Sequence, residues 1–351
     1  MPDLSTVVDL VYPAEEGGRD PAMSAARDRL KGEIARSKSA RRHRRTWAFA
    51  AGGAVALTAA GVTFGPLGFG RGGLEHADAA TVQVLDGAAA AVQGAPGARP
   101  PGPRELAYNH TQGFHLSSSD GAGPKFKTFN FIYTMEREDW TGGGLLRIRE
   151  RTTRVRFPTD RDRLAWKEGG SSLLVGDGQR GWHDQTMKIG DAGPDIFGSV
   201  GLSDEVLSGY GSDPEGLARL LRETAPRYGG QQTDEETFTL VGDLARNAEL
   251  SGNARAAVFR AAAYVADVSV VGSWTDPLGR EGVVIARTAA ASDIRTELIF
   301  DSATERLIGE RSVVRKSFDG IPVGTVVGWT ATLDQGVVDS ITSRPAGANQ
   351  P

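Results

Sequence analysis

Glycine and histidine residues are the first candidates for binding or catalysis in this sequence. Gly176, Gly178 and Gly181 match the G-x-G-x-x-G fingerprint of dinucleotide-binding sites, and a strand-like stretch precedes them. That fingerprint must open a helix whose N-terminus holds the pyrophosphate. The residues that follow contain further glycine and proline, lack a helical apolar period and belong to no βαβ unit. We therefore interpret the match as a hairpin turn and predict no cofactor.

Metal and nucleophile chemistry have little support in the sequence. His110 and His115 lie five residues apart, so on a regular strand they point to opposite faces, and His183 is distant in sequence. The absence of cysteine excludes disulfides, thiolate metal sites and a cysteine nucleophile. No serine lies in a G-x-S-x-G elbow. We predict that the protein is not an enzyme and assign no catalytic, cofactor-binding or metal-ligating residue, with an unrecognised enzyme built on paired carboxylates as an alternative.

A dense run of arginines offers a binding surface instead. Three of them alternate along a predicted strand and two more continue with the phase shifted by one: Arg147, Arg149, Arg151, Arg154 and Arg156. A break or bulge at Thr152 and Thr153 would explain the shift. Such a run suits anionic lipid headgroups or another anionic surface. Because acidic residues lie nearby in the sequence, a solvent-exposed sheet face without a ligand is the alternative.

Aromatic residues indicate a second kind of ligand. Phe129, Phe131 and Tyr133 alternate along a predicted strand. Five of the six tryptophans belong to the C-terminal two thirds of the chain: Trp140, Trp166, Trp182, Trp274 and Trp329. A concave sheet lined by such rings could hold an apolar ligand, for example a lipid.

One uncharged stretch organises the chain. The 351 residues carry a net charge of −4 and 39% hydrophobic residues, enough for a core, and residues 46–70 contain no formal charge. About 20 helical residues cross a bilayer, and Arg41, Arg42, Arg44 and Arg45 directly precede this stretch. By the positive-inside rule we predict a single-pass protein of the cell membrane, with a cytoplasmic N-terminus and residues 71–351 extracytoplasmic. A cleaved signal peptide is the alternative.

Residues 1–45 are predicted to form a cytoplasmic segment with a short basic helix at residues 23–36. Ala26, Leu30 and Ile34 form one apolar stripe on that helix. The stripe suits docking into a groove of a cytoplasmic protein partner through residues 4–34, whereas attraction to anionic inner-leaflet lipid is the simpler alternative. Asp28 and Glu33 dilute the basic charge, so we expect no nucleic-acid binding.

The remaining chain alternates between strand and helix patterns. Residues 71–103 are predicted as a helix (78–93) and a Pro/Gly-rich linker, residues 104–343 as the extracytoplasmic domain, and residues 344–351 as a disordered tail. Strands are predicted at residues 105–117, 125–137, 145–157, 268–275, 281–287, 294–300, 305–314, 325–333 and 336–341. Helices are predicted to begin at Asp213–Pro214, at the capping box 233–236 and at Ser251.

Short connections between these strands favour antiparallel pairing, since parallel strands need long crossovers. We therefore predict an α+β fold: a curved antiparallel sheet with helices packed on one face, preceded by one transmembrane helix. Two separate sheets divided near residue 210 remain the alternative arrangement.

Several features together carry a family resemblance: the basic stretch before residue 46, the Ala-rich helix after residue 70, and motifs at residues 147–158, 213–217, 238–244 and 297–311. Their order resembles a family of uncharacterised actinobacterial membrane proteins often encoded beside extracytoplasmic-function sigma factors. The outer part is also similar, more weakly, to the lipoprotein-carrier half-barrel, a fold of lipid carriers and of periplasmic regulators of anti-sigma factors. Zinc-type anti-sigma factors need a longer cytoplasmic His/Cys domain, which this chain lacks.

We therefore expect a membrane-anchored extracytoplasmic binding or sensory protein, and the resemblance implies that it regulates a sigma factor. A membrane-anchored domain that binds an apolar ligand is the first alternative. An unrecognised extracytoplasmic enzyme is the second.

The topology is directly testable. A reporter enzyme that works only outside the cytoplasm, fused after residue 75, should be active, because the arginine cluster retains only the N-terminal side inside. The same reporter fused after residue 40 should be silent. An inactive fusion at residue 75, with the full-length protein in the soluble fraction, would contradict the predicted membrane span.

Overall fold

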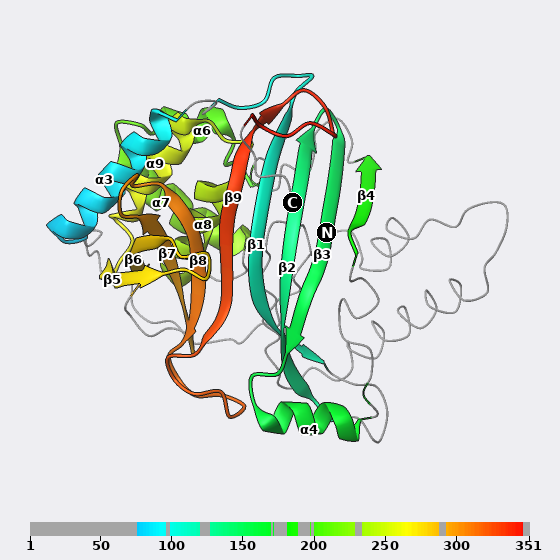
Figure 1. Ribbon diagram of the computed structural model, residues 1–351. Coiled ribbons are helices and arrows are strands. Elements are labelled where there is room, and N and C mark those ends of the chain that lie inside the picture. Colours follow the sequence, from blue (N-terminus) through cyan, green and yellow to red (C-terminus); the bar gives the residue numbers. More distant parts are fainter. Residues whose placement is uncertain are drawn as a thin grey trace. The chain divides into compact units, whose positions relative to one another are not determined.

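The computed structural model describes residues 76–95, 99–119, 127–169, 171, 181–188, 197, 200–228, 234–287 and 293–346. Within these residues the fold is α+β, with six helices and one nine-stranded antiparallel sheet in the order β4-β3-β2-β1-β9-β8-β7-β6-β5 (Figure 1). The alternative of two sheets divided near residue 210 is therefore wrong. The last strand, β9, pairs with β1 on one side and β8 on the other, and so joins the two halves.

Most strands lie close to where the sequence predicts them. They are β1 (Leu106–Ser119), β2 (Phe129–Gly142), β3 (Leu145–Arg156), β4 (His183–Lys188), β5 (Val268–Thr275), β6 (Glu281–Arg287), β7 (Ile294–Asp301), β8 (Leu307–Val314) and β9 (Val326–Val338). The sequence gives no signal for β4, whose polar residues lack the alternation of a half-buried strand. This strand is largely exposed and pairs only with β3 among the described strands.

The prediction of two strands around a turn at Asp334–Gln335 is wrong, because β9 is a single strand. It pairs with β1 over almost its whole length, and the register shifts between His110 and Thr111. One extra residue, Leu333, is accommodated there as a β-bulge. The ladder with β1 outweighs the local turn preference of the Asp-Gln pair.

The predicted helix starts are confirmed. The helices are α3 (Ala79–Gln93), α4 (Asp160–Glu168), α6 (Asp204–Gly209), α7 (Pro214–Tyr228), α8 (Asp234–Arg246) and α9 (Gly252–Ala262). Ser251 caps α9 by accepting a hydrogen bond from the Ala254 amide. Two short, polar helices, α4 and α6, are not among the predicted ones, although Thr159 and Ser203 cap them in the same way.

The main core lies between the helices and the β5–β8 half of the sheet. Fully buried residues come from four helices and two strands: Leu85, Leu221, Phe238, Leu244, Phe259, Ile285, Leu298 and Phe300. Gly242 on α8 lets that helix approach β7, since a Cβ there would lie 3.1 Å from a Leu298 methyl. We call this helix-covered side of the sheet the inner face and the opposite side the outer face.

Cross-strand register extends the inner face across the whole sheet. Leu298 pairs in turn with Glu310, which binds Arg246 of α8 on that side. The register then runs from Glu310 through Thr330 and Gly113 to Met135 of β2. Four residues before Met135, Phe131 packs with Ala165 of α4. The described helices thus pack on one face of the sheet.

The predicted cytoplasmic segment and the membrane span at residues 46–70 lie outside the described residues. No helix of the described part has the length and apolar character needed to cross a bilayer.

The core assignment predicts a specific loss of stability. Leu298→Ala removes a fully buried side chain at the contact between β7 and α8, and should lower the free energy of unfolding by about 2–5 kcal/mol. Chemical denaturation followed by tryptophan fluorescence measures this loss. Leu278→Ala, at a side chain 42% exposed, should change it by less than about 0.5 kcal/mol; equal effects of the two variants would contradict the assigned core.

Candidate functional site

A β-bulge at Thr153 places the whole arginine run on the outer face. Met135 of β2 pairs with Thr152, whereas the preceding Thr134 pairs with Arg154, so Thr153 is the extra residue. Thr152 shares the inner face with Met135, and every second position beyond the bulge returns to the outer face. The bulge predicted from the phase shift is therefore confirmed. We call these five residues the arginine row: Arg147, Arg149, Arg151, Arg154 and Arg156.

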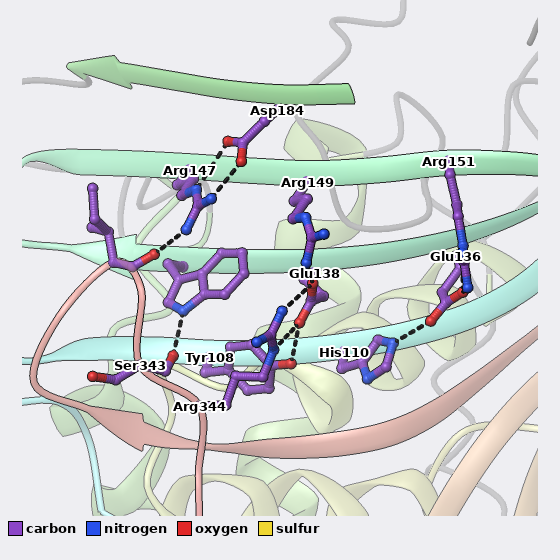
Figure 2. Close-up of polar contacts among 12 residues, drawn as sticks. Tyr108, His110, Glu136, Glu138, Arg147, Arg149, Arg151, Asp184, Ser343 and Arg344 are labelled. Carbon is purple, nitrogen blue, oxygen red and sulfur yellow. Dashed lines mark hydrogen bonds and ion pairs between the residues drawn. The ribbon is translucent and has the colours of Figure 1, made fainter. Parts of the chain in front are cut away.

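Three members of the arginine row bind carboxylates. Arg151 donates from Nε and Nη2 to Glu136 Oε2 at 2.9 and 2.6 Å. Arg149 Nη1 lies 3.0 Å from Glu138 Oε2. Arg147 donates from Nε to Asp184 Oδ1 at 2.9 Å, and a second bond makes this pair bidentate. Figure 2 shows these side chains on one side of the long strands.

Glu138 is the most deeply buried member of this network, with no exposed surface. Besides Arg149, it accepts hydrogen bonds from the Tyr108 hydroxyl at 2.7 Å and from Arg344 at 2.5 and 3.0 Å. Burial alone would raise the pKa of Glu138, but the hydrogen bonds from Arg344 and Tyr108 hold that pKa below its ordinary value. Glu138 is therefore a fixed carboxylate, with each oxygen bound by donors.

Arg344 belongs to a C-terminal segment, residues 339–346, that crosses the outer face (Figures 1 and 2). Trp140 Nε1 donates to the Ser343 carbonyl at 2.7 Å, and Arg147 Nη1 donates to the Ile341 carbonyl at 2.5 Å. The prediction of a disordered tail from residue 344 is corrected here, because the ion pair with Glu138 holds Arg344 on the sheet. Residues 347–351 lie outside the described part.

Aromatic rings stack with the arginines of the outer face. The Trp182 ring lies 4.3 Å from the Arg149 guanidinium and 4.6 Å from that of Arg151. Similar cation–π pairs join Arg147 to Trp140, Arg156 to Phe114 and Arg311 to Trp274. By register, Trp329 also lies on the outer face, beside Phe114. Of the five tryptophans expected to line a concave face, Trp166 belongs to α4 and packs with the Phe129–Phe131 cluster on the inner face.

Arg154 and Arg156 differ from the rest of the row. Both are exposed, and neither contacts a carboxylate among the described residues. Burial, and then the neighbouring Arg154 cation, lower the pKa of Arg156. On the outer face of β1–β4, the strands present only three carboxylates, Glu136, Glu138 and Asp184, to six arginines: the arginine row and Arg344. The surplus positive charge is concentrated at Arg154 and Arg156.

The structure places the three histidines considered in the sequence apart from one another. The odd spacing separates them as expected: His110 Nε2 lies 3.0 Å from Glu136 Oε1 on the outer face, whereas His115 packs against Tyr133 on the inner face. Burial lowers the pKa of His115 to about 4. His183 is exposed on β4, and no group of three metal-ligating side chains occurs in the described part. Of the glycine fingerprint, only Gly181 is described.

One carboxylate pair was invisible in the sequence. On the inner face Asp139 and Glu150 both approach Arg137, at 2.8 and 3.7 Å. Burial raises the pKa of Asp139 to about 6, even though Arg137 bonds both of its oxygens. The Arg137 guanidinium thus lies within ion-pair distance of both carboxylates. Only the cross-strand register could have revealed this pair.

Comparisons with family models, curated proteins and solved structures found no match to this chain.

Replacing Arg344 tests whether this arginine stabilises the buried carboxylate of Glu138. Arg344→Ala should lower the free energy of unfolding at pH 7 by about 2 kcal/mol, because Glu138 stays buried with fewer donors. Since the pKa of Glu138 is lowered in the folded protein, this stabilisation is complete above the ordinary value of about 4.5 and is lost as the pH falls through the lower folded value. Wild type and variant should therefore converge in acid.

Urea titrations at pH 7 and pH 3 measure both differences. Arg227→Ala, at an exposed position on α7, serves as the control and should leave stability nearly unchanged at both pH values. A difference between wild type and Arg344→Ala that persists undiminished at pH 3 would contradict the role assigned to Glu138.

Proposed function

We propose that residues 76–346 belong to the extracytoplasmic domain of a membrane-anchored sensory protein, and that this domain binds an anionic partner through Arg154 and Arg156. The observation that carries the proposal is the pairing pattern of the arginine row. Its first three members are neutralised by carboxylates, whereas the last two are exposed, adjacent and without such a partner among the described residues.

Charge and geometry both support an anion at these positions. Arg154 and Arg156 lie on the same face two residues apart, so the two positive charges repel each other. An anionic group placed between them would relieve that repulsion. Guanidinium groups bind carboxylates and phosphates through paired hydrogen bonds, as Arg147 already does with Asp184.

A binding role fits the buried charges better than catalysis does. Glu136, Glu138 and Asp139 are each held by arginine at hydrogen-bond distance. A general acid or base needs a carboxylate that can exchange a proton with substrate. Of the six buried carboxylates of the described part, five pair with arginines. The sixth, Asp162, is held by the Asn130 amide and the Thr159 hydroxyl. All six are therefore engaged within the fold, so we propose that the protein is not an enzyme.

The inner face gives less support to an apolar ligand. Its β5–β8 half is filled by the helices of the main core. On β1–β3 the inner face carries polar side chains: Asn109, Thr111, His115, Arg137, Asp139 and Glu150. An apolar ligand there would remove these polar side chains from water and offer them no hydrogen bonds in return.

The proposed membrane anchor and the proposed contact with a cytoplasmic protein are both inferred from the sequence. Residues 46–70 supply the proposed span, and the apolar stripe of residues 23–36 supplies a cytoplasmic docking helix. The family resemblance adds a sigma factor as the cytoplasmic partner. In this proposal an anionic partner outside and a protein inside are coupled through one membrane span.

Binding of anionic probes tests the proposal. The full-length protein in phosphatidylcholine nanodiscs should bind fluorescent poly-glutamate, with an affinity that falls as salt is added. Arg154→Glu combined with Arg156→Glu should weaken binding at least tenfold. Arg219→Glu combined with Arg227→Glu makes the same change of net charge on α7 of the helix layer, and should preserve binding. Equal affinity of the two double variants would contradict the proposed site.

A further inference from the structure

The edge of β3 next to Arg154 and Arg156 has no strand partner among the described residues. β4 pairs with β3 only at residues 145–150 of β3. Residues 151–156 continue to pair with β2 on the other side. On the β4 side, this stretch therefore presents backbone N–H and C=O groups without a neighbouring strand in the described part, which is the arrangement that accepts an added strand.

The spacing of the two arginines matches the repeat of such a strand. Arg154 and Arg156 occupy alternate positions on one face, which are separated by about 6.7 Å along an extended chain. Alternate side chains of a strand added at this edge have the same period and lie beside them. Acidic residues at every second position would thus meet both guanidinium groups at once.

β4 shows how the same edge is satisfied within the protein. Its Asp184 forms the bidentate pair with Arg147. Trp182, directly before β4, stacks on Arg149 and Arg151. The β4 segment therefore contributes an acidic side chain and an aromatic ring to the first three arginines of the row. Arg154 and Arg156 lie beyond the residues that pair with β4.

We propose that residues 152–156 of β3 bind an extended acidic segment of a partner protein, which adds to the sheet as a strand. Alternate Asp or Glu side chains of that segment pair with Arg154 and Arg156 on the outer face. This inference rests on the proposed function, because it uses the same two arginines, and it identifies the anionic partner as a peptide.

Two other occupants fit the edge less well. A second copy of the chain would bring a β3 edge with the same arginines, and like charges on adjacent strands repel. An anionic membrane would satisfy the charges but would leave the backbone groups of the edge unpaired. Only an acidic strand satisfies both the charges and the backbone.

Backbone-methylated peptides separate strand addition from simple charge attraction. The probe is a seven-residue peptide in which Glu alternates with Val and Thr, with both ends blocked. Two further probes carry N-methyl groups on one or the other alternate set of residues, and therefore keep the same charge. Only one set of amides of an added strand faces β3, so methylating that set should weaken binding at least tenfold, whereas methylating the other set should change it less than threefold.

The measurement is fluorescence anisotropy with the full-length protein in phosphatidylcholine nanodiscs, and phosphatidylglycerol vesicles serve as the lipid arm. Equal binding of all three peptides would overturn strand addition while the anion-binding function stands. Binding of the vesicles without binding of the peptides would also overturn it. Binding that is unaffected by Arg154→Glu with Arg156→Glu would overturn the proposed function as well.

Discussion

Two buried glutamates on the outer face, Glu136 and Glu138, set the constraint on which the arrangement of charges depends. A carboxylate removed from water is costly unless a cation and hydrogen-bond donors compensate it. Neighbouring β3 provides these cations from positions directly across from the glutamates, and Arg344 adds another from the C-terminus. The same ion pairs thereby align β3 on β2 and hold the C-terminal segment across β1 and β2.

The β-bulge at Thr153 decides on which face the last two arginines of the row lie. Without the extra residue, Arg154 and Arg156 would project from the inner face, toward the side that α4 and Phe131 occupy. With it, they continue the line of paired arginines on the outer face. The sheet thus carries one row of arginines divided into two groups, one that pairs with carboxylates of the fold and one that the proposed function assigns to a partner.

Local features of the fold were predictable from the sequence, and long-range ones were not. A helix cap such as Ser251 is recognisable from the residues next to it. The bulge at Thr153 is likewise recognisable from the shift in the alternation of the arginines. The continuity of β9 depends on its pairing with β1, more than 200 positions earlier in the chain, and so a local turn signal misled the prediction. The partners of the arginine row follow from the register of β2 on β3, and the place of Arg344 follows from tertiary packing alone.

Hydrogen exchange at arginine Nε–H groups distinguishes the members of the arginine row that bind carboxylates from those that do not. In the full-length protein labelled with nitrogen-15 arginine, NMR should show slow exchange for Arg147 and Arg151, whose Nε–H groups donate to carboxylates. Arg154 and Arg156 should exchange at the rate of exposed arginines such as Arg227. Protection of Arg154 and Arg156 equal to that of Arg147 and Arg151 would contradict the division on which the account depends.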